Sequence, residues 1–269
     1  MKPKLLITLG CSWTEGIGCY NPPISYNTNK SLNYSEKNDI IEKFYNNNLN
    51  NFHQNGWPKR IGIKLGFDKV VNLGYGGASH SYSVKRLYEY LDEERVDRYE
   101  ILIIWLMTEP VRFSFYINGR LRNFQLLPDI DNPMASAYLN EMESIELDPI
   151  LEQKFYLKTL ENLCELKNMD LITTSWNKSF LDLHGIYKSK SYLHKTPVIL
   201  EPPFPVDNDG NLINYSFCSH PNENGYEWIA NEMVKGIKEN HSKWYSVNEN
   251  PNISYSFKGK PKQHNLNLI

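Results

Sequence analysis

Long hydrophobic runs are missing from this sequence. The first apolar run extends only from Leu5 to Leu9 before Gly10 interrupts it, which is too short for the core of a signal peptide. No other segment approaches the roughly 18 apolar residues that a membrane-spanning helix needs. We therefore expect a soluble protein that carries no signal peptide and has no membrane partner.

Paired cysteines are also missing. The four cysteines are Cys11, Cys19, Cys164 and Cys218. They show no C-x-x-C spacing, which argues against a zinc site and against a disulfide framework. Reduced thiols are typical of a cytoplasmic compartment. The histidines show no ligand spacing to one another either, so we expect no metal ion.

Dense clusters of basic residues are missing as well. The chain carries 29 Lys and Arg against 31 Asp and Glu, and no Lys/Arg run is dense enough to bind a phosphate backbone. Nucleic acid is therefore not an expected partner. What the chain does have is 41% hydrophobic residues over 269 positions, which is enough for the core of one large domain.

Buried strands alternate with amphipathic helices along the chain. The apolar run Glu100–Met107 does not alternate with polar residues, as is typical of a central parallel strand that is covered on both faces. Further strands are expected at 4–9, 69–73, 171–175 and 196–200, and helices at 57–65, 79–94, 149–167 and 223–240. This alternation predicts a three-layer α/β/α domain with a parallel sheet of about five strands.

The domain is expected to span residues 1–240, with insertions at about 19–56 and 110–148. Residues 19–56 are rich in Asn, Tyr and Ser and form too long a stretch for a plain loop. In the second insertion an Asn-Gly pair at 118–119 lies between β-rich segments, which is the strongest short-range signal for a β-hairpin. Residues 241–269 are polar and aperiodic, and we expect a tail or a strap over the surface.

A serine and a histidine stand near opposite ends of this pattern. Ser12 follows the first expected strand, at the sheet edge where catalytic groups of open α/β folds gather. His220 stands directly before the last long helix. A serine hydroxyl becomes a good nucleophile when a neighbouring imidazole takes its proton, so the pair predicts nucleophilic catalysis. Taken singly, each residue has a structural alternative, Ser12 as a helix cap and His220 as an ordinary helix-start residue.

Four sequence blocks occur in a fixed order along the chain. They are Gly10-Cys11-Ser12-Trp13-Thr14, Asn72-Leu73-Gly74-Tyr75-Gly76-Gly77, Trp105-Leu106-Met107-Thr108-Glu109 and His220-Pro221-Asn222-Glu223-Asn224-Gly225-Tyr226. Over roughly residues 4–240, these blocks resemble those of the SGNH/GDSL hydrolase superfamily, in a form common in phage and environmental sequences. The resemblance implies a flavodoxin-like sheet and a protein that is cytoplasmic or virion-associated.

The resemblance also implies roles for individual residues. Ser12 would be the nucleophile and His220 the general base, and the backbone N–H groups of Ser12 and Gly77 would form two arms of an oxyanion hole. The implied reaction is hydrolysis of acyl esters, with small acyl groups on sugars or polysaccharides, such as O-acetyl groups, as the expected substrates. No cofactor is implied, and the oligomeric state is left open.

The chain departs from the family pattern in its first and fourth blocks. Cys11 stands where the first block normally has aspartate. Phe217 stands three residues before the histidine, where the family has the carboxylate of its triad. A backbone carbonyl, Asp207 or Asp209 would then orient His220. The loss of a triad aspartate can lower turnover by ~10⁴-fold.

The third block departs as well. The family has an oxyanion-binding asparagine here, whereas this chain has Thr108, which is either a hydroxyl donor or an ordinary strand-end residue. Nearby, Arg112 either binds an anionic substrate or pairs with Glu109, and we favour the ion pair. Trp13 is expected in the core or in the wall of a substrate pocket. These departures keep an alternative open, in which the chain is a catalytically degenerate module that binds glycan or has a structural or assembly role.

Overall fold

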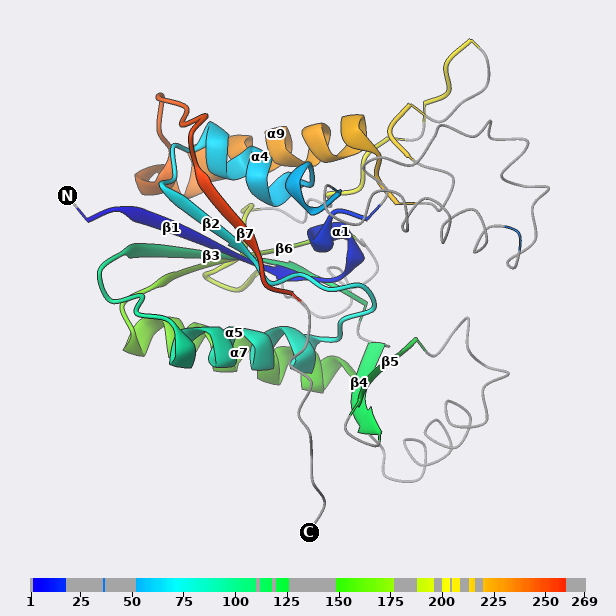
Figure 1. Ribbon diagram of the computed structural model, residues 1–269, viewed down its shortest axis with the longest axis vertical. Coiled ribbons are helices and arrows are strands. Elements are labelled where there is room, and N and C mark those ends of the chain that lie inside the picture. Colours follow the sequence, from blue (N-terminus) through cyan, green and yellow to red (C-terminus); the bar gives the residue numbers. More distant parts are fainter. Residues whose placement is uncertain are drawn as a thin grey trace.

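A parallel five-stranded sheet forms the centre of the structure, with helices on both of its faces (Figure 1). This computed structural model describes residues 2–17, 36, 52–109, 112–117, 120–125, 149–176, 188–195, 200–203, 205–208, 213–215 and 220–259. The predicted three-layer α/β/α fold with about five parallel strands is confirmed.

All five strands of the central sheet run parallel, so their carboxyl ends meet at one edge. The strands are β1 (Lys4–Gly10), β2 (Lys69–Asn72), β3 (Glu100–Met107), β6 (Asp170–Ser175) and β7 (Ser254–Phe257). Their order across the sheet is β6-β3-β1-β2-β7. Leu6 of β1 lies opposite Val70 of β2 and Leu102 of β3. β1 therefore occupies the centre, between β2 and β3.

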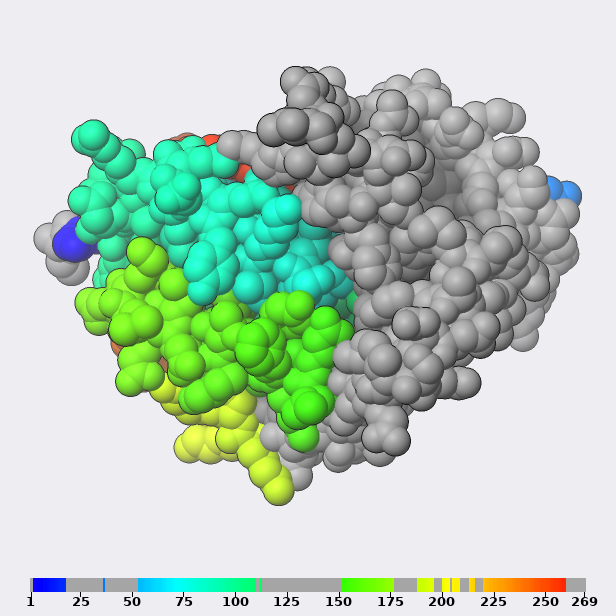
Figure 2. Space-filling view, turned by 90° about the horizontal axis from the view of Figure 1, so that it is seen from below, coloured from blue at the N-terminus to red at the C-terminus, as the bar shows by residue number. Residues whose placement is uncertain are grey.

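Two long helical segments cover each face of the sheet. The helices and 3₁₀ turns are α1 (Ser12–Glu15), η1 (Phe52–Gln54), α4 (Trp57–Lys64), α5 (His80–Glu93), α7 (Pro149–Leu166), α9 (Glu223–Asn240) and η3 (Ser242–Trp244). α4 and α9 pack together on one face (Figure 1). α5 and α7 lie side by side on the other face, which Figure 2 shows from outside.

Two hydrophobic cores, one on each face of the sheet, explain the unbroken apolar strands. Leu6 of β1 belongs to the core under α4 and α9, whereas its neighbours Leu5 and Ile7 belong to the core under α5 and α7. All three side chains are fully buried. Successive residues of a strand point to opposite faces, so a strand that is covered on both sides is apolar at every position.

A β-hairpin follows the central strand β3, as the sequence predicts. β4 (Arg112–Ile117) and β5 (Arg120–Gln125) pair antiparallel, with Ile117 opposite Arg120. The predicted turn at 118–119 lies outside the described residues. The hairpin stands next to the carboxyl edge of the central sheet (Figure 1).

The prediction of a tail at 241–269 does not hold for its described part, which extends to residue 259. β7 lies in this segment and adds an edge strand to the sheet by pairing in parallel with β2. Trp244 is fully buried, stacks on Phe67 with 5.6 Å between ring centroids, and donates its Nε1–H to Asp170 at 2.9 Å. The Ser-Tyr-Ser-Phe strand has no apolar run because its side chains stay partly exposed at the sheet edge.

Several predicted features fall largely outside the described residues. They are most of the 19–56 insertion, the 126–148 part of the second insertion, and the strand expected at 196–200 except for residue 200. The structure shows η1 near the end of the first insertion. Within the described ranges, no helix is both long enough and apolar enough to cross a membrane.

Trp244→Ala should lower the free energy of unfolding by about 3–5 kcal/mol, because it removes a fully buried indole and leaves a cavity. Urea denaturation followed by circular dichroism measures this change. Val247→Ala, at a side chain of the same segment that is 83% exposed, is the control and should change stability by less than about 0.5 kcal/mol. Equally small effects of both substitutions would show that this segment is not part of the core.

Candidate active site

The first three sequence blocks meet at the carboxyl edge of the sheet. Gly10, the last residue of β1, lies opposite Leu106 of β3, and its carbonyl accepts the Tyr75 N–H at 3.1 Å. The loops after β1, β2 and β3 therefore leave the sheet at the same level (Figure 1). This edge is where open α/β sheets bind their ligands.

A sharp turn after β1 places Ser12 at the start of helix α1. Gly10 has a φ of +146°, which L side chains rarely adopt, and a Cβ there would lie 2.2 Å from Thr14 Oγ1. Only glycine fits this position. Ser12 is 6% exposed, and its backbone N–H has no hydrogen-bond partner among the described residues. The first N–H groups of a helix have no partner within it, so this donor is available to a ligand.

The segment that begins helix α9 holds His220. Asn222 caps the helix, since its Oδ1 accepts the Gly225 N–H at 3.1 Å. Tyr226, in the first turn of α9, donates its hydroxyl to the Ile17 carbonyl at 2.6 Å. This bond ties the start of α9 to the residues that directly follow α1.

These two elements bring Ser12 and His220 together. Ser12 Oγ lies 2.9 Å from His220 Nε2, which is hydrogen-bond distance, although 208 positions separate the two residues in the sequence. With a neutral imidazole, the serine hydroxyl donates this bond to Nε2. A nucleophile and its general base must lie within this reach. The geometry therefore permits the proton transfer that a serine nucleophile requires.

The second block forms a turn whose last glycine offers another backbone donor. Gly77 has a φ of +73°, and the turn closes with the Ala78 N–H donating to the Tyr75 carbonyl at 2.9 Å. In the part of the chain that the structure describes, the Gly77 N–H has no partner. Ser12 and Gly77 thus each present an available N–H group at the same edge of the sheet.

Two buried side chains tie the second block to the first. Asn72 accepts the Gly74 N–H at 2.9 Å through Oδ1, and its Nδ2 donates to the Thr14 carbonyl at 2.8 Å. Glu15, one helical turn after the serine, accepts the Gly76 N–H at 2.5 Å through Oε2. Glu15 is not among the site residues that the sequence predicts. The sequence signal for Glu15 is a carboxylate one helical turn after the serine. The N–H groups of the glycine turn need an acceptor, and this carboxylate supplies one.

Thr108 lies two residues beyond Leu106, level with the first block. It is 1% exposed, and its Oγ1 has no hydrogen-bond partner within the described ranges. Buried hydroxyl groups are normally hydrogen-bonded. Because this hydroxyl has no partner among the described residues, it is available to a ligand. The ion pair favoured from the sequence is present next to it, because Arg112 Nε lies 3.1 Å from Glu109 Oε2.

Trp13 and two aspartates are the remaining predicted site residues. Trp13 belongs to the core and stacks on Trp176, with 4.7 Å between ring centroids. Only 7% of Trp13 is exposed, so its ring is part of the core and not an open platform. Asp207 is exposed, and Asp209 lies outside the described residues. Their role in orienting His220 stays a prediction.

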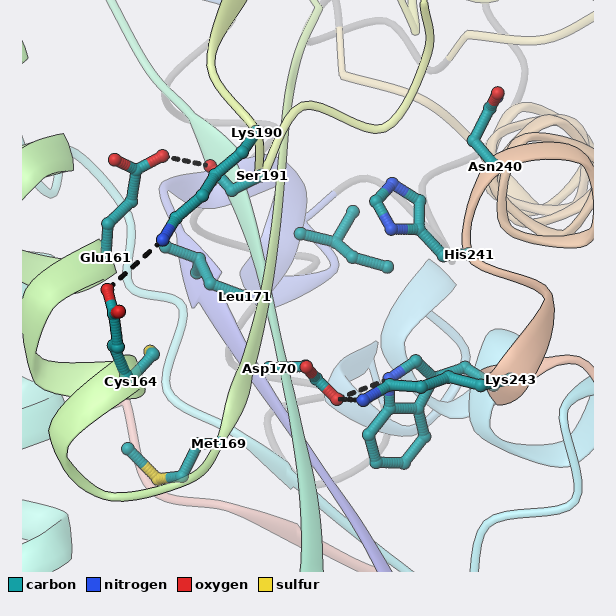
Figure 3. A pocket seen from close by; sticks show the side chains of 13 residues that line it. Glu161, Cys164, Met169, Asp170, Leu171, Lys190, Ser191, Asn240, His241 and Lys243 are labelled. Atoms are coloured by element: carbon teal, nitrogen blue, oxygen red, sulfur yellow. Dashed lines mark hydrogen bonds and ion pairs between the residues drawn. The ribbon is translucent and has the colours of Figure 1, made fainter.

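A pocket of about 470 Å³ lies at a different place, beside the first residues of β6 (Figure 3). Its walls carry paired charges, since Lys190 contacts Glu165 and Lys243 contacts Asp170. Burial raises the pKa of the Cys164 thiol in this wall to about 12, so a reactive thiolate does not form there. Among the described residues, no group of three or more His, Cys, Asp or Glu side chains could hold a metal ion. The Ser–His pair at the sheet edge is therefore the better candidate for chemistry.

Comparisons with known proteins do not assign a function to this chain. No protein-family model and no curated protein matches this chain. Among solved structures, one similar chain is described as a lipolytic protein of the G-D-S-L family from Desulfitobacterium hafniense DCB-2. It shares 12% sequence identity, and the match covers 87% of this chain and 99% of that chain with a TM-score of 0.44. A similarity of this size carries no argument about activity.

Glu15→Ala should lower the free energy of unfolding by about 1–3 kcal/mol, because it leaves the Gly76 N–H without its acceptor. Glu15→Gln keeps an acceptor oxygen and should recover more than half of that loss. Urea unfolding curves of the two variants and the wild type give the comparison. Equal losses in both variants would show that the charge of Glu15, and not its bond to Gly76, holds this loop.

Proposed function

We propose that this protein is a serine hydrolase that cleaves acyl esters. The observation that carries the proposal is the 2.9 Å distance between Ser12 Oγ and His220 Nε2. The position of the pair adds support, because the strand register brings the Ser12 and Gly77 N–H groups, which have no partner among the described residues, to the same edge of the sheet. Nucleophile, base and oxyanion donors are the three parts that acyl transfer needs.

In the proposed reaction, Ser12 Oγ attacks the ester carbonyl while His220 Nε2 takes the hydroxyl proton. The tetrahedral intermediate collapses as the imidazolium passes that proton to the leaving alcohol, and the acyl group stays on Ser12. Water then attacks the acyl-enzyme, with His220 again as the base, and the carboxylic acid leaves. The enzyme returns to its starting state, and the reaction consumes only ester and water, so it requires no cofactor.

Donors from three loops would bind the oxyanion of the intermediate. They are the backbone N–H groups of Ser12 and Gly77, which have no competing partner among the described residues, and the buried hydroxyl of Thr108. Removal of one such donor typically lowers turnover by ~10²–10³-fold. A hydroxyl in place of the family's asparagine still donates one hydrogen bond, because its proton rotates to suit the acceptor.

We further propose small acyl groups on carbohydrate, such as O-acetyl groups, as the substrates. The 6% exposure of Ser12 favours a small acyl group over a bulky one. The carbohydrate part of the proposal comes from the resemblance of the four sequence blocks, since a fold alone does not define a substrate. A backbone carbonyl, Asp207 or Asp209 would orient the imidazole of His220.

Ser12→Ala should lower kcat/KM for p-nitrophenyl acetate by at least about 10³-fold, because it removes the nucleophile. His220→Ala should have a similar effect, since the serine then has no proton acceptor. Ser191→Ala removes a buried hydroxyl in the pocket of Figure 3 and is the matched control, with wild-type activity expected. Wild-type rates in Ser12→Ala would rule out this hydrolase mechanism and favour a binding or assembly role.

Thr108→Val removes the third donor at nearly constant volume. For the same ester, kcat should fall by about 10–10³-fold with little change in KM, because the lost hydrogen bond forms in the transition state. Thr108→Ser keeps the hydroxyl and should retain most of the activity. Steady-state kinetics of the three proteins makes the comparison, and an unchanged kcat in Thr108→Val would assign Thr108 to the core alone.

A further inference from the structure

Two buried tyrosines flank His220 in the sequence, and the proposed reaction uses neither of them. Tyr215 is 2% exposed, and Tyr226 is fully buried. Both belong to the hydrophobic core under α4 and α9. The hydroxyl of a buried tyrosine normally has a hydrogen-bond partner, and this partner shows which parts of the chain the side chain connects.

Tyr226 connects the first turn of α9 to the end of α1. Its hydroxyl donates to the Ile17 carbonyl at 2.6 Å, and the Ile17 N–H donates to the Ser12 carbonyl at 3.1 Å. Two consecutive hydrogen bonds therefore lead from α9 to the backbone of the serine. Only two residues separate His220 from the first residue of α9, so this connection runs from the base to the nucleophile.

Tyr215 contacts a neighbour of the serine and a neighbour of the histidine. Its ring packs edge-on against Trp13, with 6.4 Å between ring centroids. Its backbone forms an antiparallel bridge with Pro221, and its carbonyl accepts the Asn222 side-chain N–H at 3.3 Å. Its hydroxyl donates to the Pro202 carbonyl at 2.7 Å. The segment that carries the histidine is thus packed against the start of α1.

We propose that Tyr215 and Tyr226 are positioning residues that hold His220 at hydrogen-bond distance from Ser12. The two contacts act at opposite ends of α1, one near its first residue and one just after its last. A helix of four residues has little stability of its own, so tertiary contacts determine where it lies. This inference deepens the proposed hydrolase function and rests on it.

The proton transfer depends on the short distance that these contacts maintain. Ser12 Oγ and His220 Nε2 lie 2.9 Å apart, although they come from distant segments of the chain. A displacement of about 1 Å in a catalytic group can lower the rate by about 10²-fold. Loss of either tyrosine contact should therefore lower kcat, whereas substrate binding should stay nearly unchanged.

Ion pairs also hold the start of α9, but they connect it to a different helix. Arg60 and Lys64 of α4 lie 2.6 Å and 2.8 Å from the carboxylate oxygens of Glu227. The Glu227 side chain is 38% exposed, and ion pairs at such exposure contribute little. Glu227 therefore separates a general anchor of α9 from the specific connection to α1.

Kinetics of matched variants on p-nitrophenyl acetate test the role of Tyr226. Tyr226→Phe removes one hydroxyl and keeps the ring, and kcat should fall by about 10–10²-fold with KM changed by less than about threefold. Tyr82→Phe is the matched control, because its hydroxyl is also buried and donates to the Gly259 carbonyl at 2.6 Å. Glu227→Gln, which weakens the ion pairs of α9, is the second control. Both controls should keep kcat within about twofold of the wild-type value.

Two substitutions at the same position test the role of Tyr215. Tyr215→Leu removes the ring contact with Trp13, and kcat should fall by about 10–10²-fold. Tyr215→Phe keeps the ring against Trp13 and should recover most of this loss. If one of the variants Tyr215→Leu and Tyr226→Phe does not fold, the other decides the test.

Urea unfolding and amide hydrogen exchange separate positioning from stability. Tyr226→Phe and Tyr82→Phe each lose one buried hydrogen bond, so their urea midpoints should fall by similar amounts. In Tyr226→Phe, exchange should rise severalfold in the peptides that contain Ser12 and His220, because the two segments are no longer joined. Tyr82→Phe should not change exchange in these peptides.

A wild-type kcat in Tyr226→Phe would overturn the inference. An equal loss of activity in Tyr82→Phe or Glu227→Gln would also overturn it, because the loss would then follow stability and not the connection to α1. Equal losses in Tyr215→Leu and Tyr215→Phe would reject the ring contact as a positioning device. Inactivity of Ser12→Ala with wild-type rates in the tyrosine variants rejects this inference alone, whereas full activity of Ser12→Ala rejects the proposed function.

Discussion

The parallel register of β1 with its two neighbours is the constraint on which the candidate site depends. Gly10 lies opposite Leu106, and its carbonyl accepts the Tyr75 N–H, so the first three blocks leave the sheet together. The register itself is set by burial. Both faces of β1 are covered by apolar cores, and a slip of one residue would send each side chain to the opposite face. The cores that stabilise the domain thus also place the serine.

Polar side chains in the interior then fix the loops relative to one another. Asn72 and Glu15 accept from or donate to backbone groups of the neighbouring loop. Burying such groups costs free energy unless they are hydrogen-bonded, so each bond constrains the loop that supplies its partner. The N–H groups of Ser12 and Gly77 and the hydroxyl of Thr108 remain without a partner among the described residues. Free donors held on fixed loops are what the proposed oxyanion hole requires.

Much of this arrangement could be predicted from the sequence because its signals are local. The unbroken apolar run Glu100–Met107 marks a strand covered on both faces, and the motifs around Ser12 and His220 mark the loops that meet. The edge strand β7 has no such run, since its place depends on pairing with β2 at the border of the sheet. Glu15 could not be assigned, because its role depends on which backbone group faces it in three dimensions.

Covalent labelling with a fluorophosphonate, followed by peptide mass mapping, tests the central claim most directly. The account predicts one adduct, on the hydroxyl of Ser12, formed because His220 activates that hydroxyl at a distance of 2.9 Å. His220→Ala should abolish the labelling while the protein stays folded. An adduct on another residue, or equal labelling with and without the imidazole, would contradict the account.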